Sequence, residues 1–274
     1  GMALQLARWD LTPAGAYAVA AARDPHGVAL VDDEGPLTFR ELDQRSDRVA
    51  GELRAQGLLP GDRAGLLARN GRGFLEALVA LVKCGADVLL LNTGFAGPQV
   101  TAVLDHEDAS LVVHDAEFAE LLAGASHGRL HLTTEELDLV AGGGTHPAPP
   151  PPGRQSRIVI LTSGTTGAPR GAARSSGTAD DLIAFLSAIP LRAGERTVIA
   201  APVFHAWGLG HLTLAVLLGS TVVLQRRFDP KAVLAAVEEH RATALVVVPV
   251  MLDKLLAADP SRYDLSSLRV IASS

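Results

Sequence analysis

The stretch Arg157 to Gly171 reads RIVILTSGTTGAPRG and joins an apolar run to a loop of small residues. Ile158 to Leu161 has the length and β-branched composition of a buried strand. The glycines after it let the backbone approach a ligand, and the hydroxyl side chains supply donors beside exposed N–H groups. A loop of this kind at a strand's end indicates a site for phosphate oxygens. The predicted phosphate-binding residues are Thr162, Ser163, Gly164, Thr165, Thr166, Gly167 and Gly171.

Two further residues define the chemistry of this loop. Arg170 adds a permanent cation whose planar guanidinium suits phosphate, and Pro169 stiffens the turn before it. A Walker-type loop has the pattern G-x-x-x-x-G-K-(S/T), with a second glycine five residues after the first. Five residues after Gly164 this chain has Pro169 instead of glycine. A kinase-type P-loop is therefore excluded at this position.

The run resembles the phosphate loop of the adenylate-forming superfamily, which includes acyl-CoA synthetases, luciferases and peptide-synthetase adenylation domains. The family pattern is (S/T)-S-G-(S/T)-T-G-x-P-K-G, and this chain departs from it only at Arg170, where lysine is usual. The phrases LTFRELDQRSDRVAGEL, GLLPGDRAGLLARN, ALVALVKCGADVLLLNT and GFAGPQVTAVLDHEDASLVVHD also follow the order of an acyl-CoA synthetase's opening subdomain. From about Tyr17 to Ser274 the chain resembles the N-terminal part of a fatty-acid-CoA ligase-like acyl-CoA synthetase.

A second group of residues lies in Ala201 to Gly210, which reads APVFHAWGLG and follows a predicted strand. Open α/β sheets place ligands at the carboxyl ends of their strands, so His205 is a candidate for contact with a carboxylate or phosphate. On spacing alone, a satisfied core histidine is the favoured interpretation. The resemblance favours function instead, because acyl-CoA synthetases carry a similar P-x-F-H-x-x-G run whose histidine lies beside the bound carboxylate.

The resemblance implies that a carboxylic acid attacks the α-phosphate of ATP, and that coenzyme A then displaces AMP from the acyl-adenylate. His205 and Arg170 are the predicted catalytic residues, and Mg²⁺ is expected to arrive with ATP. A fatty acid is expected as substrate, because the candidate pocket residues are apolar. These residues are Val203, Phe204, Trp207, Leu209 and Pro249. His211 matches nothing in the family run and is interpreted as structural, and no cluster has the spacing of a metal site.

Apolar strands alternate with amphipathic helices along the chain, which predicts an α/β fold with two doubly wound βα subdomains. Predicted strands include 28–31, 64–68, 88–91, 111–114, 197–200 and 244–248, and predicted helices include 38–57, 74–83, 117–122, 175–189, 209–218 and 230–240. The glycine- and proline-rich segment 141–154 is interpreted as a linker. We therefore expect a first subdomain at 1–152 and a second, carrying the phosphate loop, at 153–274.

Composition narrows the class of protein. The 274 residues are 48% hydrophobic and carry a formal net charge of -6, which indicates a globular protein and argues against nucleic-acid binding. Apolar runs are interrupted by charges, so no membrane span is predicted. The single cysteine, Cys84, lies in an apolar run and is expected to be buried and unreactive. No secretory signal is apparent, so a cytoplasmic location is expected; a homo-oligomer is possible.

The chain ends where the resemblance predicts a glycine-rich adenine loop. A Tyr-Gly-x-Thr-Glu segment, a ribose-binding aspartate, a β-barrel subdomain and a mobile C-terminal domain would follow in the family. We therefore expect this chain alone to be inactive. Two alternatives stay open. One is an adenylation domain for an amino or aryl acid. The other is a non-catalytic binding module that retains a phosphate or acyl pocket, or that mediates association through its apolar surface.

Overall fold

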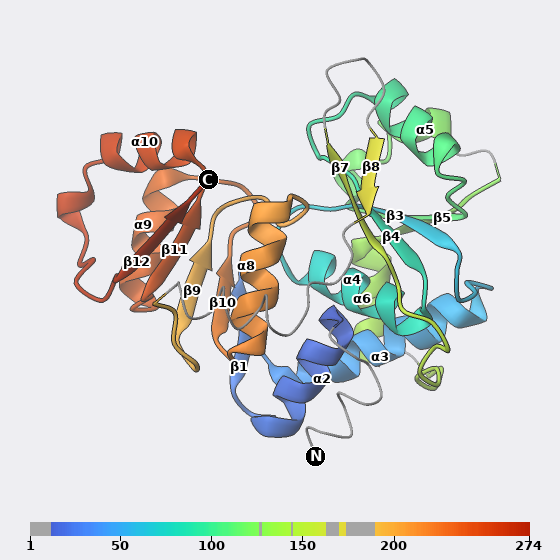
Figure 1. Ribbon diagram of the computed structural model, residues 1–274, viewed down its shortest axis with the longest axis horizontal. Helices are drawn as coiled ribbons and strands as arrows, with labels where there is room; N and C mark the ends of the chain where they lie inside the picture. Colours follow the sequence, from blue (N-terminus) through green and yellow to red (C-terminus); the bar gives the residue numbers. More distant parts are fainter. Residues whose placement is uncertain (1–11, 126–127, 144, 163–169, 174–189) are drawn as a thin grey trace.

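The computed structural model of the chain describes residues 12–125, 128–143, 145–162, 170–173 and 190–274. Within these residues the strands form two sheets that lie side by side (Figure 1). Sheet A has the order β12-β11-β9-β10-β1-β2, and sheet B has the order β6-β5-β3-β4-β7-β8. All neighbouring strands are parallel except the pairs β1–β2 and β7–β8. The predicted α/β class with mostly parallel, doubly wound sheets is confirmed.

The strands of sheet A are β1 (Val28–Asp32), β2 (Gly35–Thr38), β9 (Arg196–Ile199), β10 (Thr221–Leu224), β11 (Ala244–Val247) and β12 (Val270–Ser273). Those of sheet B are β3 (Arg63–Leu67), β4 (Asp87–Leu90), β5 (Leu111–His114), β6 (Leu130–Thr133), β7 (Ile158–Thr162) and β8 (Arg170–Ala173). The α-helices are α2 (Pro13–Arg23), α3 (Phe39–Ala55), α4 (Arg72–Cys84), α5 (Gly97–His106), α6 (Thr134–Gly143), α8 (Ala206–Leu217), α9 (Pro230–Glu239) and α10 (Pro249–Ala257). Short 3₁₀ turns are η1 (Ala116–Phe118), η2 (Ala123–Ala125) and η3 (Pro260–Arg262).

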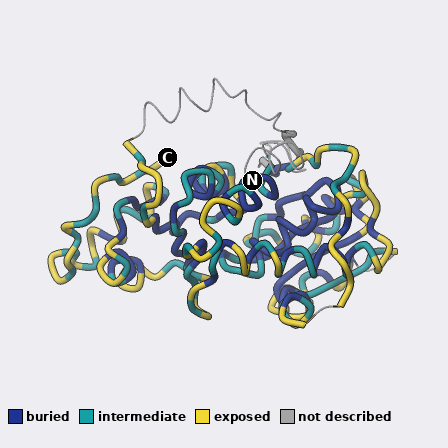
Figure 2. Tube along the Cα trace, turned by 90° about the horizontal axis from the view of Figure 1, so that it is seen from below, coloured by how far each residue is buried: buried dark blue, intermediate teal, exposed yellow. Residues whose placement is uncertain are grey.

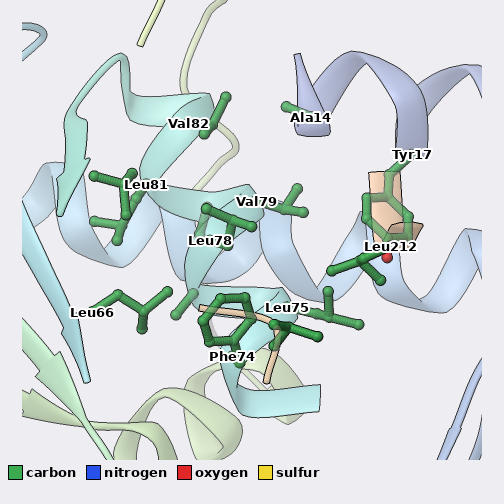
Figure 3. Packing of buried hydrophobic residues seen from close by; sticks show 14 of the residues in the cluster. Ala14, Tyr17, Leu66, Phe74, Leu75, Leu78, Val79, Leu81, Val82 and Leu212 are labelled. Carbon is green, nitrogen blue, oxygen red and sulfur yellow. The ribbon is translucent and has the colours of Figure 1, made fainter. Parts of the chain in front are cut away.

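One hydrophobic core is shared by the two sheets. It joins one face of each sheet to helices α2, α3, α4, α6 and α8. Figure 3 shows Leu75, Leu78 and Val79 of α4 together with Tyr17 of α2 and Leu212 of α8. Smaller cores cover the opposite faces, with α5 on sheet B and with α9 and α10 on sheet A. The tube in Figure 2 accordingly shows buried segments inside both halves and exposed ones at their margins.

The two sheets do not divide the chain at the predicted boundary of 152/153. Strand β1 pairs with the later strand β10 in sheet A and carries β2 at the sheet's edge, while β7 pairs with β4 through Val88↔Ile158 in sheet B. The strand before the phosphate loop therefore belongs to the sheet built mainly by the first half of the chain. Sheet membership depends on pairing between distant segments, which local periodicity does not encode. Subdomains at 1–152 and 153–274 stay a prediction.

Three elements also differ locally from the sequence-based predictions. The helix predicted at 117–122 is replaced by η1, a turn and η2, because six residues are too few for a stable α-helix. The predicted linker begins later than expected, since α6 continues to Gly143. Pro249, which follows the predicted strand at 244–248, opens α10 at its first position, where proline's missing N–H costs nothing. The helix predicted at 175–189 lies outside the described residues.

Two further expectations from the sequence concern membrane-spanning helices and the thiol of Cys84. Within the described ranges, no helix has both the length and the apolar composition that crossing a bilayer requires. Cys84 is buried, its thiol lies 3.4 Å from the Ala50 carbonyl oxygen, and burial raises its pKa to about 12. A thiol in this state is a poor nucleophile at neutral pH, as predicted.

Candidate active site

The structure describes the two flanks of the predicted phosphate loop. Thr162 is the last residue of β7 and pairs antiparallel with Arg170, the first residue of β8, and Leu161 pairs with Gly171. The loop thus leaves and re-enters sheet B through adjacent strands. The other predicted loop residues, Ser163, Gly164, Thr165, Thr166 and Gly167, lie outside the described residues.

The segment around His205 follows the carboxyl end of β9, as predicted. His205 is the N-cap of α8, with an extended backbone (φ -94°, ψ 153°), and its carbonyl accepts from the Leu209 N–H at 2.9 Å. Helix α8 begins at Ala206, earlier than the predicted Leu209. Its first turn packs tightly on the preceding loop, because a Cβ added at Gly208 would lie only 2.3 Å from the Pro202 carbonyl oxygen.

The His205 side chain is exposed although its backbone is held in place. Its ring lies 4.6 Å from that of Phe204, at an interplanar angle of 47°. Desolvation by these neighbours lowers the pKa of His205 below its ordinary value of 6.5. At neutral pH the imidazole is therefore uncharged, with one nitrogen that donates and one that accepts.

The structure separates the predicted acyl-pocket residues into two groups. Trp207 is held beside the end of β11, because its Nε1 donates to the Val247 carbonyl at 2.9 Å, and Pro249 is exposed just beyond. Val203 is fully buried in the shared core, and Phe204 and Leu209 are 6% and 8% exposed. Trp207 and Pro249 are thus the more accessible of the predicted pocket residues, whereas Val203 packs in the core.

Sequence reasoning missed one residue that contacts this segment. Asn70 follows β3 in sheet B and is buried. Its Nδ2 donates to the Ala201 carbonyl at 3.1 Å, and its Oδ1 accepts from the Val203 N–H at 2.9 Å. Because Ala201 lies 131 residues away in sequence, no local pattern points to this contact.

His211 lies one turn into α8 and is buried. Its ring packs edge-on against Trp207 at 4.3 Å, and Nδ1 lies 2.9 Å from the Trp207 carbonyl oxygen. Burial lowers the pKa of His211. In the part of the chain that the structure describes, no three His, Cys, Asp or Glu side chains gather closely enough to hold a metal ion.

Charged residues gather where the carboxyl ends of β3, β5 and β10 meet. Glu117 accepts hydrogen bonds from Arg69 at 2.8 Å, Arg226 at 2.9 Å and Arg227 at 2.7 Å. These guanidinium groups, Arg69 foremost, lower the pKa of Glu117 to about 2. Since Arg226 and Arg227 follow a strand of sheet A, the cluster ties the two sheets together at this edge.

The two mostly parallel sheets form an α/β fold of the class that binds ligands at the carboxyl ends of its strands, and the segments after β7 and β9 both begin at such ends. A family model described as AMP-binding enzyme matches residues 17–274. The chain belongs to this family.

Particular relatives are CoA ligases. The chain is 38% identical over 263 residues to a feruloyl-CoA synthase from Amycolatopsis sp, covering 94% of this chain and 53% of the relative. It is 31% identical over 242 residues to a 2-succinylbenzoate–CoA ligase from Bacillus licheniformis, covering 85% of this chain and 49% of the relative. The chain thus spans about half the length of these curated relatives.

Solved structures support the same fold. The N-terminal domain of FACL13 from Mycobacterium tuberculosis matches with a TM-score of 0.86 at 22% identity, covering 95% of this chain and 69% of that one. The o-succinylbenzoate CoA synthetase MenE from Bacillus subtilis, in complex with the acyl-adenylate intermediate OSB-AMP, matches with a TM-score of 0.82 at 26% identity, covering 94% and 53%. The chain therefore has the fold of the N-terminal domains of adenylate-forming enzymes.

Proposed function

We propose that this chain supplies the acid- and phosphate-binding part of an ATP-dependent CoA ligase. The carboxylate attacks the α-phosphate of ATP, pyrophosphate leaves, and the thiol of coenzyme A then displaces AMP to give the thioester. The observation that carries this proposal is the exposed His205 at the start of α8, on a backbone fixed after the carboxyl end of β9. Membership of the AMP-binding family and the names of the CoA-ligase relatives support this reaction class.

His205 is proposed to orient the acid. A neutral imidazole donates one hydrogen bond to a carboxylate oxygen without forming an ion pair, so the carboxylate keeps its negative charge for the attack. The amino-terminal end of α8 adds the partial positive charge of the helix dipole on the same side. Positioning and charge stabilisation of this kind account for most of the catalysis in phosphoryl-group chemistry.

The loop between β7 and β8 is proposed to hold the β- and γ-phosphates. Its hydroxyl residues and backbone N–H groups would surround the phosphate oxygens, and Arg170 would stabilise the departing pyrophosphate. Mg²⁺ bound to ATP would neutralise part of the phosphate charge. The short connection between two paired strands supports this role, because it restricts how far the loop's ends move.

The acid is proposed to have an apolar body. Trp207 and the beginning of α10 offer an aromatic and an aliphatic wall at the end of β11. An aryl acid is the first candidate, in line with the names of the feruloyl-CoA synthase and the 2-succinylbenzoate–CoA ligase. The fatty acid expected from the sequence is the second, supported by the name of the fatty acid–[acyl-carrier-protein] ligase ScoC from Streptomyces coeruleorubidus, which is 29% identical.

A binding panel tests this proposal on the chain itself. Ferulate, dodecanoate and phenylalanine would each be titrated in the presence of ATP and Mg²⁺, with binding followed by isothermal calorimetry and by NMR of chains carrying ¹³C-labelled histidine. We expect ferulate or dodecanoate to bind saturably and to shift the signals of the His205 ring. Binding of phenylalanine alone would favour an amino-acid adenylation domain. If no acid binds, the proposal is wrong.

A further inference from the structure

We propose that Asn70 is a positioning residue for the His205 segment, acting on it from the other sheet. Asn70 follows β3 of sheet B, whereas His205 follows β9 of sheet A. The expected effect of Asn70 on acid affinity rests on the function proposed above. Its expected effect on the position of the His205 ring does not rest on that function and is tested separately below.

Asn70 holds its partners through both ends of its carboxamide. Nδ2 donates to the Ala201 carbonyl oxygen at 3.1 Å, and Oδ1 accepts from the Val203 N–H at 2.9 Å. Asn70 is 8% exposed, and Ala201 and Val203 are 1% and 0% exposed. A buried backbone group left without a partner costs about 1–3 kcal/mol, so this pair of bonds specifies one position for the segment. Among natural side chains of this length, only asparagine offers both a donor and an acceptor in one plane.

Asn70 is itself fixed, because its neighbours are anchored on both sides. The Arg69 N–H donates to Asp115 Oδ2 at 2.9 Å. The Arg72 N–H donates to Asp32 Oδ2 at 2.8 Å, and the Arg72 guanidinium binds the same carboxylate and the Gly35 carbonyl. The connection from β3 to α4 is thus held by a residue after β5 and by the last residue of β1. A side chain on a connection held this way can impose a position on its partner.

A short series of contacts leads from Asn70 to the imidazole. Ala201 also donates its N–H to the Val246 carbonyl at 3.1 Å, so this residue is held by β11 on one side and by Asn70 on the other. The Pro202 carbonyl accepts from the His205 N–H at 3.2 Å and lies against Gly208 of α8. Three consecutive residues before Phe204 and His205 therefore have fixed backbones. The exposed ring takes its direction from that backbone.

A purely structural role for Asn70 makes a different prediction. In that case, removing the carboxamide lowers the stability of the folded protein but leaves the His205 ring unchanged in the molecules that stay folded. In a positioning role, the ring's environment and its acid affinity change as well. The two roles are separated by measurements on His205, not by stability.

The experiment compares Asn70→Ala and Asn70→Asp with Asn92→Ala in chains carrying ¹³C-labelled histidine. Asn70→Asp is nearly isosteric, keeps an acceptor for Val203 and loses the donor to Ala201. Asn92 is a matched control, because it follows β4 as Asn70 follows β3, but among the described residues its side chain bonds to the nearby Gly94 N–H at 2.8 Å and not to another sheet. The readouts are amide exchange at Val203, the ring signals and titration of His205, and the affinity for ferulate or dodecanoate.

In Asn70→Ala we expect amide exchange at Val203 to accelerate about tenfold to hundredfold. The His205 ring signals should shift, its titration midpoint should rise toward the ordinary value as the ring becomes more hydrated, and acid affinity should fall about tenfold. Asn70→Asp should change the His205 signals while keeping more protection at Val203. Asn92→Ala should match the wild type in all three measurements.

Unchanged His205 signals and titration in both Asn70 variants would overturn the inference, as would an equal change in Asn92→Ala. If Asn70→Ala does not fold, Asn70→Asp and Asn70→Ser decide by the same criteria. Failure of the wild type to bind any acid would refute the proposed function. The inference about Asn70 would then be decided by the ring signals alone.

Discussion

His205 combines an exposed ring with a backbone that buried partners hold on two sides. The sequence predicted its place, because a strand, a short loop and an apolar helix follow one another and the carboxyl ends of parallel strands meet at one edge of a sheet. The sequence did not predict Asn70, whose partners lie in another sheet. Nor did it predict that Val203 is buried in the shared core; its place in an acyl pocket stays a prediction.

At this residue scale we predict a loss of stability in mild acid. Desolvation lowers the pKa values of the buried His211 and the less buried His205 and His131 below the ordinary 6.5, so the unfolded chain binds more protons than the folded one just below that pH. Stability should be unaffected by these groups above about pH 6.5 and should fall as the pH drops through that value toward the folded-state pKa.

Denaturant unfolding at pH 7.5 and pH 5.5 measures this effect. His211→Gln should reduce the difference between the two pH values, because His211 is 4% exposed and its Nε2 has no partner among the described residues. His26→Gln, which changes an exposed histidine, is the control. If the free energy of unfolding changes as much between the two pH values in His211→Gln as in the wild type, His211 is not a source of the acid sensitivity.

Elements whose signals are local were predicted well. The capping box of α3 is present, since the Glu41 N–H donates to Thr38 Oγ1 at 3.2 Å and the Thr38 N–H donates to Glu41 Oε2 at 2.8 Å. The predicted strand at 111–114 coincides with β5. Elements with weak local signals were missed. Strand β6 is short and is held by its pairing with β5, and helix α6 has a weakly amphipathic sequence and is held by packing against α3.

At the element scale we predict opposite effects for two glycines in α8. Alanine at Gly208 would place Cβ 2.3 Å from the Pro202 carbonyl oxygen, whereas no atom lies within 4 Å of a Cβ added at Gly210. Gly208→Ala should therefore lower the free energy of unfolding by about 1–3 kcal/mol through overpacking. Gly210→Ala should raise it by about 0.5–1 kcal/mol through helix propensity. Urea unfolding of both variants gives the comparison. Equal changes in the free energy of unfolding would contradict the close contact between Gly208 and the Pro202 carbonyl oxygen.

At the scale of the whole molecule, three sets of polar contacts among the described residues join the sheets beyond their shared core. Asp32 of β1 binds Arg72 at the start of α4, Asn70 binds the segment after β9, and Glu117 binds Arg226 and Arg227 after β10. All three involve residues at the carboxyl ends of strands, where both predicted ligand-binding segments also begin. Interleaved pairing of the chain and these contacts explain why a boundary at 152/153 does not separate the sheets.

At this scale we predict that Glu117 links the sheets in a pH-dependent way. Its pKa of about 2 lies below the ordinary carboxyl value of 4.5, so its contribution is present above about pH 4.5 and is lost as the pH falls toward 2. Glu117→Gln should lower the free energy of unfolding by about 1–2 kcal/mol at pH 7, allowing for solvent screening, and should approach the wild type near pH 2. Denaturant unfolding across this range, with the exposed Glu120→Gln as control, tests the link. A difference that does not vary with pH would contradict it.

The most direct test of the account is calorimetric titration of the chain with a stable acyl-adenylate analogue, in which a sulfamoyl group replaces the phosphate of feruloyl- or dodecanoyl-AMP. We predict saturable binding at one site, weakened about tenfold or more in His205→Ala and unchanged in His26→Ala. Binding that is absent from the wild type, or equally strong in His205→Ala, would contradict the claim that the segment after β9 receives the acid.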